Sequence, residues 1–306
     1  MRLLVVGAGS TGGYYGGRLA QAGRDVTFLV RPGRAAQLQE NGLQIVSPYG
    51  DFTCTPKLVT AGQIRGPYDA VILTVKAYSL EAALEDLAPA IGPQTMILPV
   101  LNGMRHVEAI RARFGAQTLV GGLCRIPAQL DDAGRVIQMG KFHDLAYGEM
   151  DGSTSSRITA LDAALKNAGF DAKLTSEIER EMWEKWTLLA ALGGICCLMR
   201  GTVGEVAAAP GGGDFSAAIV DEVVGAVRAV GKAPSESFVA STREALTKVG
   251  STHTSSMYRD LQKGAAVEAD QIVGDLLRRA QQAGIAMPLL SLAYANLCVY
   301  QSRRAA

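Results

Sequence analysis

Residues 2–12 read Arg-Leu-Leu-Val-Val-Gly-Ala-Gly-Ser-Thr-Gly and place a G-x-G-x-x-G pattern directly after an apolar run of strand length. In this setting the first glycine permits a tight turn, the second lets the backbone approach a pyrophosphate, and the third lets the following helix pack on the strand. The phosphates are expected to lie on unpaired N–H groups at the helix N-terminus. We therefore predict a dinucleotide site formed by Gly7, Ala8, Gly9, Ser10, Thr11 and Gly12.

The end of the second predicted strand, residues 26–30, indicates which dinucleotide binds. NAD sites usually carry an Asp or Glu there for the ribose 2′-hydroxyl, whereas NADP sites carry a cation for the 2′-phosphate. This chain has Arg31 and Arg34 after the strand and no carboxylate, and Asp25 lies at the strand's other end. We predict NADP(H) as the cofactor, with Arg31 at the 2′-phosphate. The alternative is that both arginines are solvated loop residues.

The composition is typical of a globular protein with a small ligand. The chain has 306 residues, of which 48% are hydrophobic and 19% charged, which is enough for one large domain or two ordinary ones. A net charge of +1 provides no electrostatic attraction to nucleic acid or to an anionic membrane. No apolar stretch reaches the roughly 20 residues of a membrane helix. Because the fingerprint begins at Gly7, we expect no leader peptide before it.

The cysteines favour a reducing compartment. There are five of them, an odd number that includes the adjacent pair Cys196-Cys197, which is not typical of a disulfide framework. No Cys-x-x-Cys accompanies the three histidines, so we expect no metal site. We predict a cytoplasmic protein.

Strand and helix signals alternate in the first half of the chain and predict a parallel sheet with helices on both faces. The predicted strands include residues 3–6, 26–30, 43–46, 69–74, 96–101 and 118–121, with antiparallel additions at 123–127, 135–139 and 144–147. Residues 131–134, Asp-Asp-Ala-Gly, predict a hairpin turn.

Helical signals take over in the second half of the chain. They cover residues 156–168, 177–199, 215–231, 235–249, 267–283 and 289–301. The predicted fold class is therefore α/β, with an N-terminal Rossmann-type doubly wound parallel sheet and an all-helical C-terminal domain. We place the NADP-binding domain at residues 1–170 and the helical substrate and catalytic domain at residues 171–306. We expect catalysis between the domains, because ligands bind beyond the carboxyl ends of parallel strands.

Several polar residues are candidates for chemistry. Lys76 and Asn102 each follow a predicted strand, where a cation meets an anion and an amide both donates and accepts hydrogen bonds. Lys185 begins an otherwise apolar helical run and suits a general acid. Ser256 and Glu268 supply a hydroxyl and a carboxylate. The structural alternatives are a solvated lysine at 76, a turn at 102, a snorkelling lysine at 185, and capping or surface roles for the last two.

Together these motifs resemble the ketopantoate reductase (2-dehydropantoate 2-reductase) family. The motifs are Gly-Ala-Gly-Ser-Thr-Gly at 7–12, Thr74-Val75-Lys76-Ala77, Asn102-Gly103-Met104, Trp183-x-Lys185, Ser255-Ser256-Met257-x-x-Asp260 and Glu268. They occur in order over nearly the whole chain. The resemblance implies NADPH-dependent reduction of a 2-oxo acid to a 2-hydroxy acid, in pantothenate biosynthesis for the family's own substrate.

The resemblance also implies residue roles. Lys185 matches the catalytic lysine, which protonates the carbonyl oxygen as hydride arrives at the carbon. Asn102 orients the carbonyl and the nicotinamide, and Ser256 binds the substrate carboxylate. The expected cofactor contacts further along the chain are Lys76, Asn102, Ala128 and Glu268. A cation stabilises the negative charge that develops on oxygen, while the nicotinamide carries the hydride.

The resemblance fails at two positions of the lysine helix. The family has asparagines four and eight residues after the catalytic lysine, and this chain has Leu189 and Gly193 there. Loss of amides that contact substrate hydroxyls can change specificity by orders of magnitude. We therefore expect a relative of the family that acts on a more apolar 2-oxo acid.

Two other functions stay open at this point. A 3-hydroxy acid or polyol dehydrogenase shares a nucleotide domain with a helical partner and also uses a lysine, but it leaves the Asn-Gly-Met and Ser-Ser-Met segments unexplained. A non-catalytic NADPH-binding regulator fits the lost asparagines, whereas Lys185 argues against it. The apolar helical half makes a homodimer plausible.

Overall fold

The computed structural model describes residues 1–305, which divide into two compact units. The first unit contains residues 1–101 and 106–179, and the second contains residues 102–105 and those from 180 onward. Residues 171–179, which we expected in the helical domain, belong to the first unit. The reason is that β12 (Asp171–Leu174) pairs in parallel with β11 (Asp144–Gly148).

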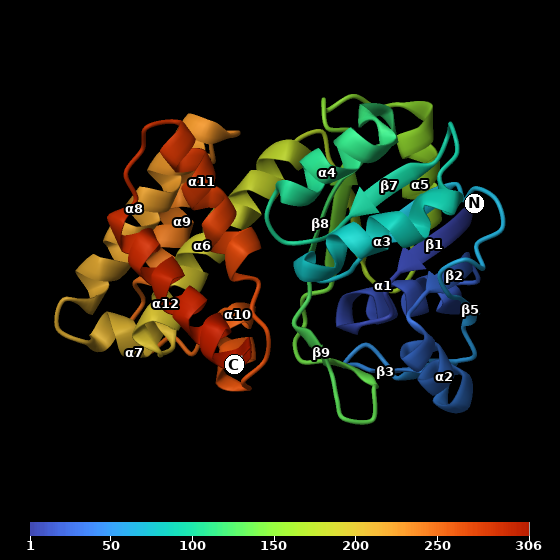
Figure 1. The fold of residues 1–306 in the computed structure, drawn as a ribbon, viewed down its shortest axis with the longest axis horizontal. Coiled ribbons are helices and arrows are strands. Elements are labelled where there is room, and N and C mark those ends of the chain that lie inside the picture. The colour runs from blue at the N-terminus through green and yellow to red at the C-terminus, as the bar shows by residue number, and fades with distance from the viewer. Residues whose placement is uncertain (306) are drawn as a thin grey trace. The chain divides into compact units, whose positions relative to one another are not determined.

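The main sheet of the first unit is entirely parallel, as predicted. Its order is β5-β2-β1-β6-β7, and β5, β2, β1 and β7 are labelled in Figure 1. These strands are β1 (Arg2–Val6), β2 (Asp25–Leu29), β5 (Lys57–Val59), β6 (Ala70–Leu73) and β7 (Met96–Pro99). All four residues of β6 and all four of β7 are buried, which explains why these strands read as continuous apolar runs.

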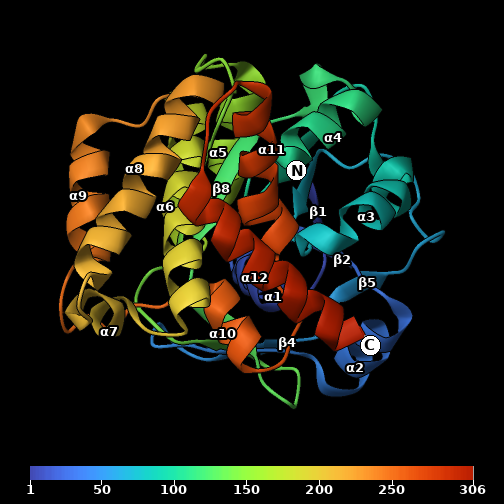
Figure 2. The same cartoon turned by 60° about the vertical axis from the view of Figure 1, so that its left-hand side comes forward.

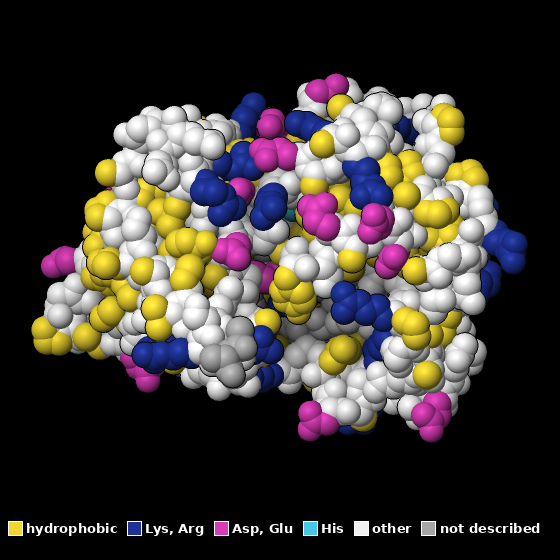
Figure 3. All heavy atoms as spheres, in the orientation of Figure 1, with side chains coloured by type: hydrophobic (Ala, Val, Ile, Leu, Met, Phe, Trp, Pro, Cys, Tyr) yellow, Lys and Arg dark blue, Asp and Glu magenta, His cyan; other side chains and the backbone are white. Residues whose placement is uncertain are grey.

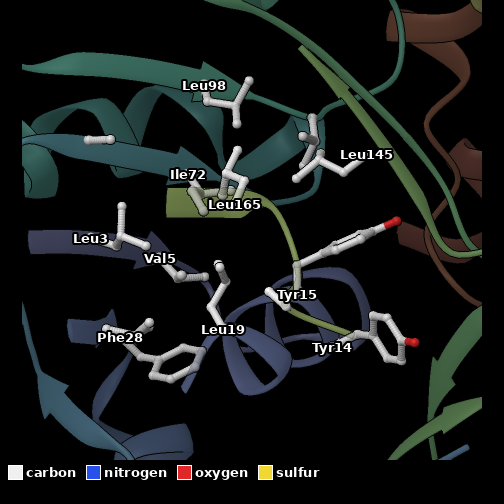
Figure 4. Close-up of a cluster of buried hydrophobic side chains, with 14 of the residues drawn as sticks. Leu3, Val5, Tyr14, Tyr15, Leu19, Phe28, Ile72, Leu98, Leu145 and Leu165 are labelled. Atoms are coloured by element: carbon white, nitrogen blue, oxygen red, sulfur yellow. The ribbon is translucent and has the colours of Figure 1, made fainter. Parts of the chain in front are cut away.

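The helices of the first unit include those expected between the parallel strands. They are α1 (Ser10–Gln21), α2 (Pro32–Asn41), α3 (Leu80–Leu87), α4 (Arg105–Phe114) and α5 (Ser156–Leu165). Figure 4 shows how α1 contributes to the core: Leu19 points toward Val5 and Phe28 of the sheet, and Tyr15 extends toward Leu145. This packing holds α1 in place directly behind the fingerprint.

Two smaller sheets complete the first unit. One has the order β4-β3-β10-β9 and the other β12-β11-β8. Their remaining strands are β3 (Leu43–Val46), β4 (Phe52–Cys54), β8 (Gly121–Arg125), β9 (Ala128–Leu130) and β10 (Val136–Gln138). Because α1 contacts β1 and β2 as well as β3, β9 and β10, it lies between the main sheet and the β4-β3-β10-β9 sheet.

The prediction of a strand at residues 118–121 is wrong. Ala116–Thr118 form a 3₁₀ turn, and only Leu119 makes a bridge to Ile97 of the main sheet. β8 begins at Gly121 and pairs antiparallel with β11. The chain therefore leaves the parallel sheet after a single bridge, which the apolar pattern did not indicate.

All regular secondary structure among the described residues of the second unit is helical, as predicted. Its helices are α6 (Ile178–Met199), α7 (Val203–Ala208), α8 (Gly212–Val230), α9 (Glu236–Leu246), α10 (Ser256–Gln262), α11 (Asp275–Gln282) and α12 (Pro288–Ala305), with a π-helical turn at Asp270–Gly274. Figure 2 shows the long helices side by side. α8 contacts α7, α9, α11 and α12. α6 joins this packing at Gly194, which faces Leu290 of α12 and Ile219 of α8.

The surface and the cysteines agree with the composition. On the face drawn in Figure 3, Lys and Arg side chains are interspersed with Asp and Glu. All five cysteines are free thiols. Between residues 1 and 305, no helix combines the length and apolar character that a membrane crossing requires.

Candidate functional site

The fingerprint loop joins β1 to α1 and leaves an uncapped helix N-terminus. Gly7 has φ +94°, a left-handed conformation that favours glycine. Gly9 precedes α1, no side chain caps the helix, and its first turn contains no acidic residue. The N–H groups of this turn therefore lack side-chain acceptors, and with the positive end of the helix dipole they suit an anion.

The space around the loop fits a bound pyrophosphate. A Cβ at Gly9 would meet no atom within 4 Å, so the backbone there is open to a ligand. A Cβ at Gly12 would overlap the carbonyl oxygen of Gly7 and the Oγ1 of Thr74, so only glycine lets α1 approach this closely. Thr74, which follows β6, holds the loop because its Oγ1 lies 2.8 Å from the Val6 carbonyl oxygen and 2.9 Å from that of Gly7.

The two arginines after β2 have different positions. Arg31 is exposed, and its Nη2 donates to Ser79 Oγ at 3.0 Å. Arg34 is half-buried, and its Nε donates to the carbonyl oxygen of Ala8 at 3.0 Å. Burial lowers the pKa of the Arg34 guanidinium. Asp25 pairs with Lys57 at 2.7 Å at the start of the strand. Arg31 therefore lies at the surface after β2, while Arg34 is held against the fingerprint loop.

The other first-unit candidates lie at strand ends. Lys76 is exposed and follows β6, where it precedes the 3₁₀ turn Ala77–Ser79. Ala128 is half-buried and begins β9, opposite Gln138 of β10. The hairpin turn predicted after β9 is present, with the Gly134 N–H donating to the Asp131 carbonyl oxygen at 2.9 Å.

Asn102 belongs to the second unit, together with the rest of residues 102–105. Its side chain is half-buried. Gly103 follows with φ +78°, and a Cβ there would lie 2.7 Å from the carbonyl oxygen of Gln271. The backbone after Asn102 thus packs directly against the π-helical turn.

Lys185 lies near the start of α6, with a half-buried side chain. Leu189 and Gly193 follow at intervals of four residues, so they share one helix face with it. A Cβ at Gly193 would lie 2.7 Å from the Cε of Met257. The methionine methyl therefore occupies the space beside Gly193, and this part of the lysine face is apolar.

Ser256 begins α10, and Glu268 lies in the segment between α10 and the π-helical turn. Ser255 is the N-cap of α10 and accepts a hydrogen bond from the Tyr258 N–H at 3.0 Å. The capping role expected as an alternative for Ser256 therefore falls to Ser255, and Ser256 is the first helical residue, half-buried. Glu268 is buried, with 7% of its surface exposed.

Some features of these sites were not predicted from sequence. The tie between Arg34 and Ala8 was not expected, although the spacing of two arginines after the strand could have suggested it. The π-helical turn has no recognised sequence signal. A surface pocket of about 580 Å³ in the first unit is lined by Arg18, Tyr49, His143 and Asp171 among others, and it contains none of the predicted site residues. Among residues 1–305, no group of three or more His, Cys, Asp and Glu could hold a metal ion.

Comparisons with known proteins place both parts of the chain in one family. Residues 3–152 match the family model described as ketopantoate reductase PanE/ApbA, and residues 177–301 match the model of its C-terminal part. The uncharacterized oxidoreductase YkpB of Bacillus subtilis (strain 168) is 36% identical over 304 residues, which cover 99% of this chain and all of that protein.

Two further comparisons carry a named activity. The 2-dehydropantoate 2-reductase of Halobacterium salinarum is 28% identical over 295 residues, or 95% of each chain. The crystal structure of 2-dehydropantoate 2-reductase from Geobacter metallireducens GS-15 superimposes with a TM-score of 0.86 at 29% identity, covering 97% of this chain and 99% of that one.

Proposed function

Because this chain belongs to the ketopantoate reductase family of NADP-dependent oxidoreductases acting on CH–OH groups, we propose that it reduces a 2-oxo acid to the 2-hydroxy acid, as a 2-dehydropantoate 2-reductase or a close relative with an altered substrate pocket. The observation that carries the proposal is the composition of one face of α6. Lys185 is present there, while Leu189 and Gly193 stand where the family has amides, and the Met257 methyl lies against Gly193.

The first unit supplies the cofactor site. The uncapped N-terminus of α1 and the open backbone at Gly9 receive the pyrophosphate. Arg31 is exposed after β2 and pairs with the 2′-phosphate, which gives the preference for NADPH over NADH. Lys76 and Ala128 of the first unit, together with Glu268 of the second, complete the cofactor contacts in this proposal. When bound, NADPH supplies the hydride.

The second unit supplies the acid and the orienting groups. The Lys185 ammonium hydrogen-bonds the substrate carbonyl oxygen, stabilises the negative charge as hydride reaches the carbon, and gives its proton to that oxygen. The Asn102 amide orients the carbonyl, and the Ser256 hydroxyl donates to the substrate carboxylate. The substrate side chain contacts the apolar surface of Leu189, Gly193 and Met257. That surface has no amide for a hydroxyl group.

A panel of 2-oxo acids, assayed by steady-state NADPH oxidation, tests the proposal. The informative pair is ketopantoate and 3,3-dimethyl-2-oxobutanoate, which differ only by the 4-hydroxyl group. We expect both to turn over, with kcat/KM values within about tenfold of each other, because full hydroxyl recognition would separate them by orders of magnitude. A preference for ketopantoate of about a thousandfold over every other acid would contradict the altered pocket. Absence of any turnover, with NADPH binding intact, would favour a regulator.

A further inference from the structure

The π-helical turn Asp270–Gly274, which we call the π turn, stands between Ala269 and α11. A π-helical turn inserts one extra residue into a helix at a cost in hydrogen-bond geometry, and such turns are frequent at functional sites. The position of this one is set by its neighbours in the second unit. Contacts with these neighbours, and not the helix alone, therefore account for the π turn.

The π turn contacts the two segments that carry the proposed catalytic residues Asn102 and Lys185. On one side, Gly103 packs against the carbonyl oxygen of Gln271, where even a Cβ would lie only 2.7 Å away. On the other side, the indole Nε1 of Trp186 donates to the carbonyl oxygen of Ile272 at 2.9 Å. Gly103 follows Asn102, and Trp186 follows Lys185. The π turn is thus adjacent to both segments.

The side chain of Gln271 is buried without a partner for its carbonyl. Only 9% of its surface is exposed, and its Oε1 accepts no hydrogen bond within the described protein. A buried acceptor that lost its water without gaining a donor costs free energy. Native proteins leave few such atoms, and a ligand that supplies a donor is one explanation for them.

We propose that Gln271 is a substrate-binding residue, whose amide accepts a hydrogen bond from a hydroxyl group on the side chain of the 2-oxo acid. This inference rests on the proposed function. The amide contact that Leu189 and Gly193 do not provide on α6 is made from the π turn instead. The substrate class is a largely apolar 2-oxo acid that carries one hydrogen-bond donor.

The test compares Gln271→Met with the wild type on ketopantoate and 3,3-dimethyl-2-oxobutanoate. One neutral hydrogen bond corresponds to about three- to tenfold in kcat/KM, so the wild type favours the hydroxylated acid by that factor. Gln271→Met removes the preference by lowering kcat/KM for the hydroxylated acid alone. Gln271→Glu keeps an acceptor and retains part of the preference, and it replaces the methionine variant if that one fails to fold.

A matched control is Gln301→Met. Gln301 lies on α12 and also has an Oε1 without a partner, so the substitution removes a second buried acceptor of this kind outside the π turn. We expect it to leave the substrate ratio unchanged.

Four outcomes would overturn the role of Gln271. They are a wild-type ratio near one, a ratio that Gln271→Met does not move, an equal loss for both acids, and a loss of NADPH affinity in place of substrate selectivity. A wild type that turns over neither acid would instead overturn the proposed function. Failure of the two proposals is therefore distinguishable.

Discussion

Arg34 donates a hydrogen bond from Nε to the carbonyl oxygen of Ala8, 3.0 Å away, and so joins the first turn of α2 to the fingerprint loop. Its Nη1 donates to Gln37 of the same helix. Arg31, three residues earlier, is exposed and reaches Ser79. Two arginines that look equivalent in sequence thus have different structural positions, one behind the loop and one at the surface.

This difference predicts distinct effects on cofactor binding. Arg31→Gln should weaken NADPH binding by about 10- to 100-fold and leave NADH binding nearly unchanged, because a charged hydrogen bond to the 2′-phosphate contributes roughly 1.5–3 kcal/mol. Arg34→Gln should weaken both cofactors by the same factor, because the loop that receives the shared pyrophosphate loses its support. Fluorescence titration with each cofactor measures both affinities. An Arg34 variant impaired for NADPH alone would contradict this division of roles.

Two glycines of the fingerprint should respond differently to alanine. Gly12→Ala forces a Cβ into the Gly7 carbonyl and Thr74 Oγ1, and we expect the free energy of unfolding to fall by about 1–3 kcal/mol. Gly9→Ala adds a Cβ where no atom lies within 4 Å, so stability should hold while NADPH affinity drops. Urea unfolding and cofactor titration of both variants separate the two effects. Equal destabilisation by both would show that the loop geometry differs from the one described.

Lys185→Ala should abolish most of the catalysis without affecting cofactor binding. Loss of a general acid typically lowers kcat by about 10²–10⁴, and Lys185 lies in the second unit, outside the fingerprint. The measurement is kcat with the best 2-oxo acid, alongside the Kd for NADPH. Lys248→Ala, which removes an exposed lysine of the same unit, is the control and should retain wild-type kcat. Retention of kcat in the Lys185 variant would show that Lys185 is not the general acid.

Amides returned to α6 should restore discrimination by the hydroxyl group. We expect the double variant Leu189→Asn, Gly193→Asn to raise the ratio of kcat/KM for ketopantoate over 3,3-dimethyl-2-oxobutanoate by about tenfold or more. At position 193 the Met257 methyl has to move aside, since it lies 2.7 Å from the new Cβ. A terminal methyl of methionine adapts readily. An unchanged ratio in a folded variant would show that this face of α6 does not determine recognition of the substrate hydroxyl.

The stability of the first unit should depend on pH through His143. Its ring is buried against Tyr49, its Nδ1 lies 2.8 Å from Tyr14 Oη, and its Nε2 lies 3.7 Å from the Asp171 carboxylate. Burial lowers the pKa of His143, with a further lowering by Arg18 and an opposing effect of Asp171. The folded state therefore binds fewer protons than the unfolded state below the ordinary histidine pKa of about 6.5.

The sign of the pH dependence follows from that lowered pKa. This contribution to the free energy of unfolding is fully present above about pH 6.5 and decreases as the pH falls toward the folded-state value. Urea unfolding at a series of pH values, for the wild type and His143→Gln, should show a shallower pH dependence in the variant. His253→Gln makes the corresponding test in the second unit, because burial also lowers the pKa of His253 and its contribution has the same sign. Identical slopes for wild type and His143→Gln would exclude the effect.

Much of the first unit was predictable because its signals are local. The fingerprint at residues 7–12 and the apolar runs of β6 and β7 each report on a short stretch of backbone and its immediate burial. The strand predicted at 118–121 failed because a strand needs a partner. Leu119 has one bridge to Ile97, and the chain then pairs with β11. Partner choice depends on distant residues, which hydrophobic periodicity does not report.

The candidate site also combines features that local sequence predicts with contacts that only tertiary packing decides. The glycine spacing, the arginines after β2 and the lysine on an apolar helix are properties of local sequence, and they indicated a dinucleotide, its phosphate and an acid. Their resemblance to a family extended that to a reaction. The hydrogen bond from Arg34 to Ala8 and the Met257 methyl beside Gly193 join residues far apart in the chain, and the burial of the Gln271 Oε1 without a donor also depends on distant neighbours. Only tertiary packing decides such contacts, because side-chain burial and hydrogen-bond pairing depend on which elements meet.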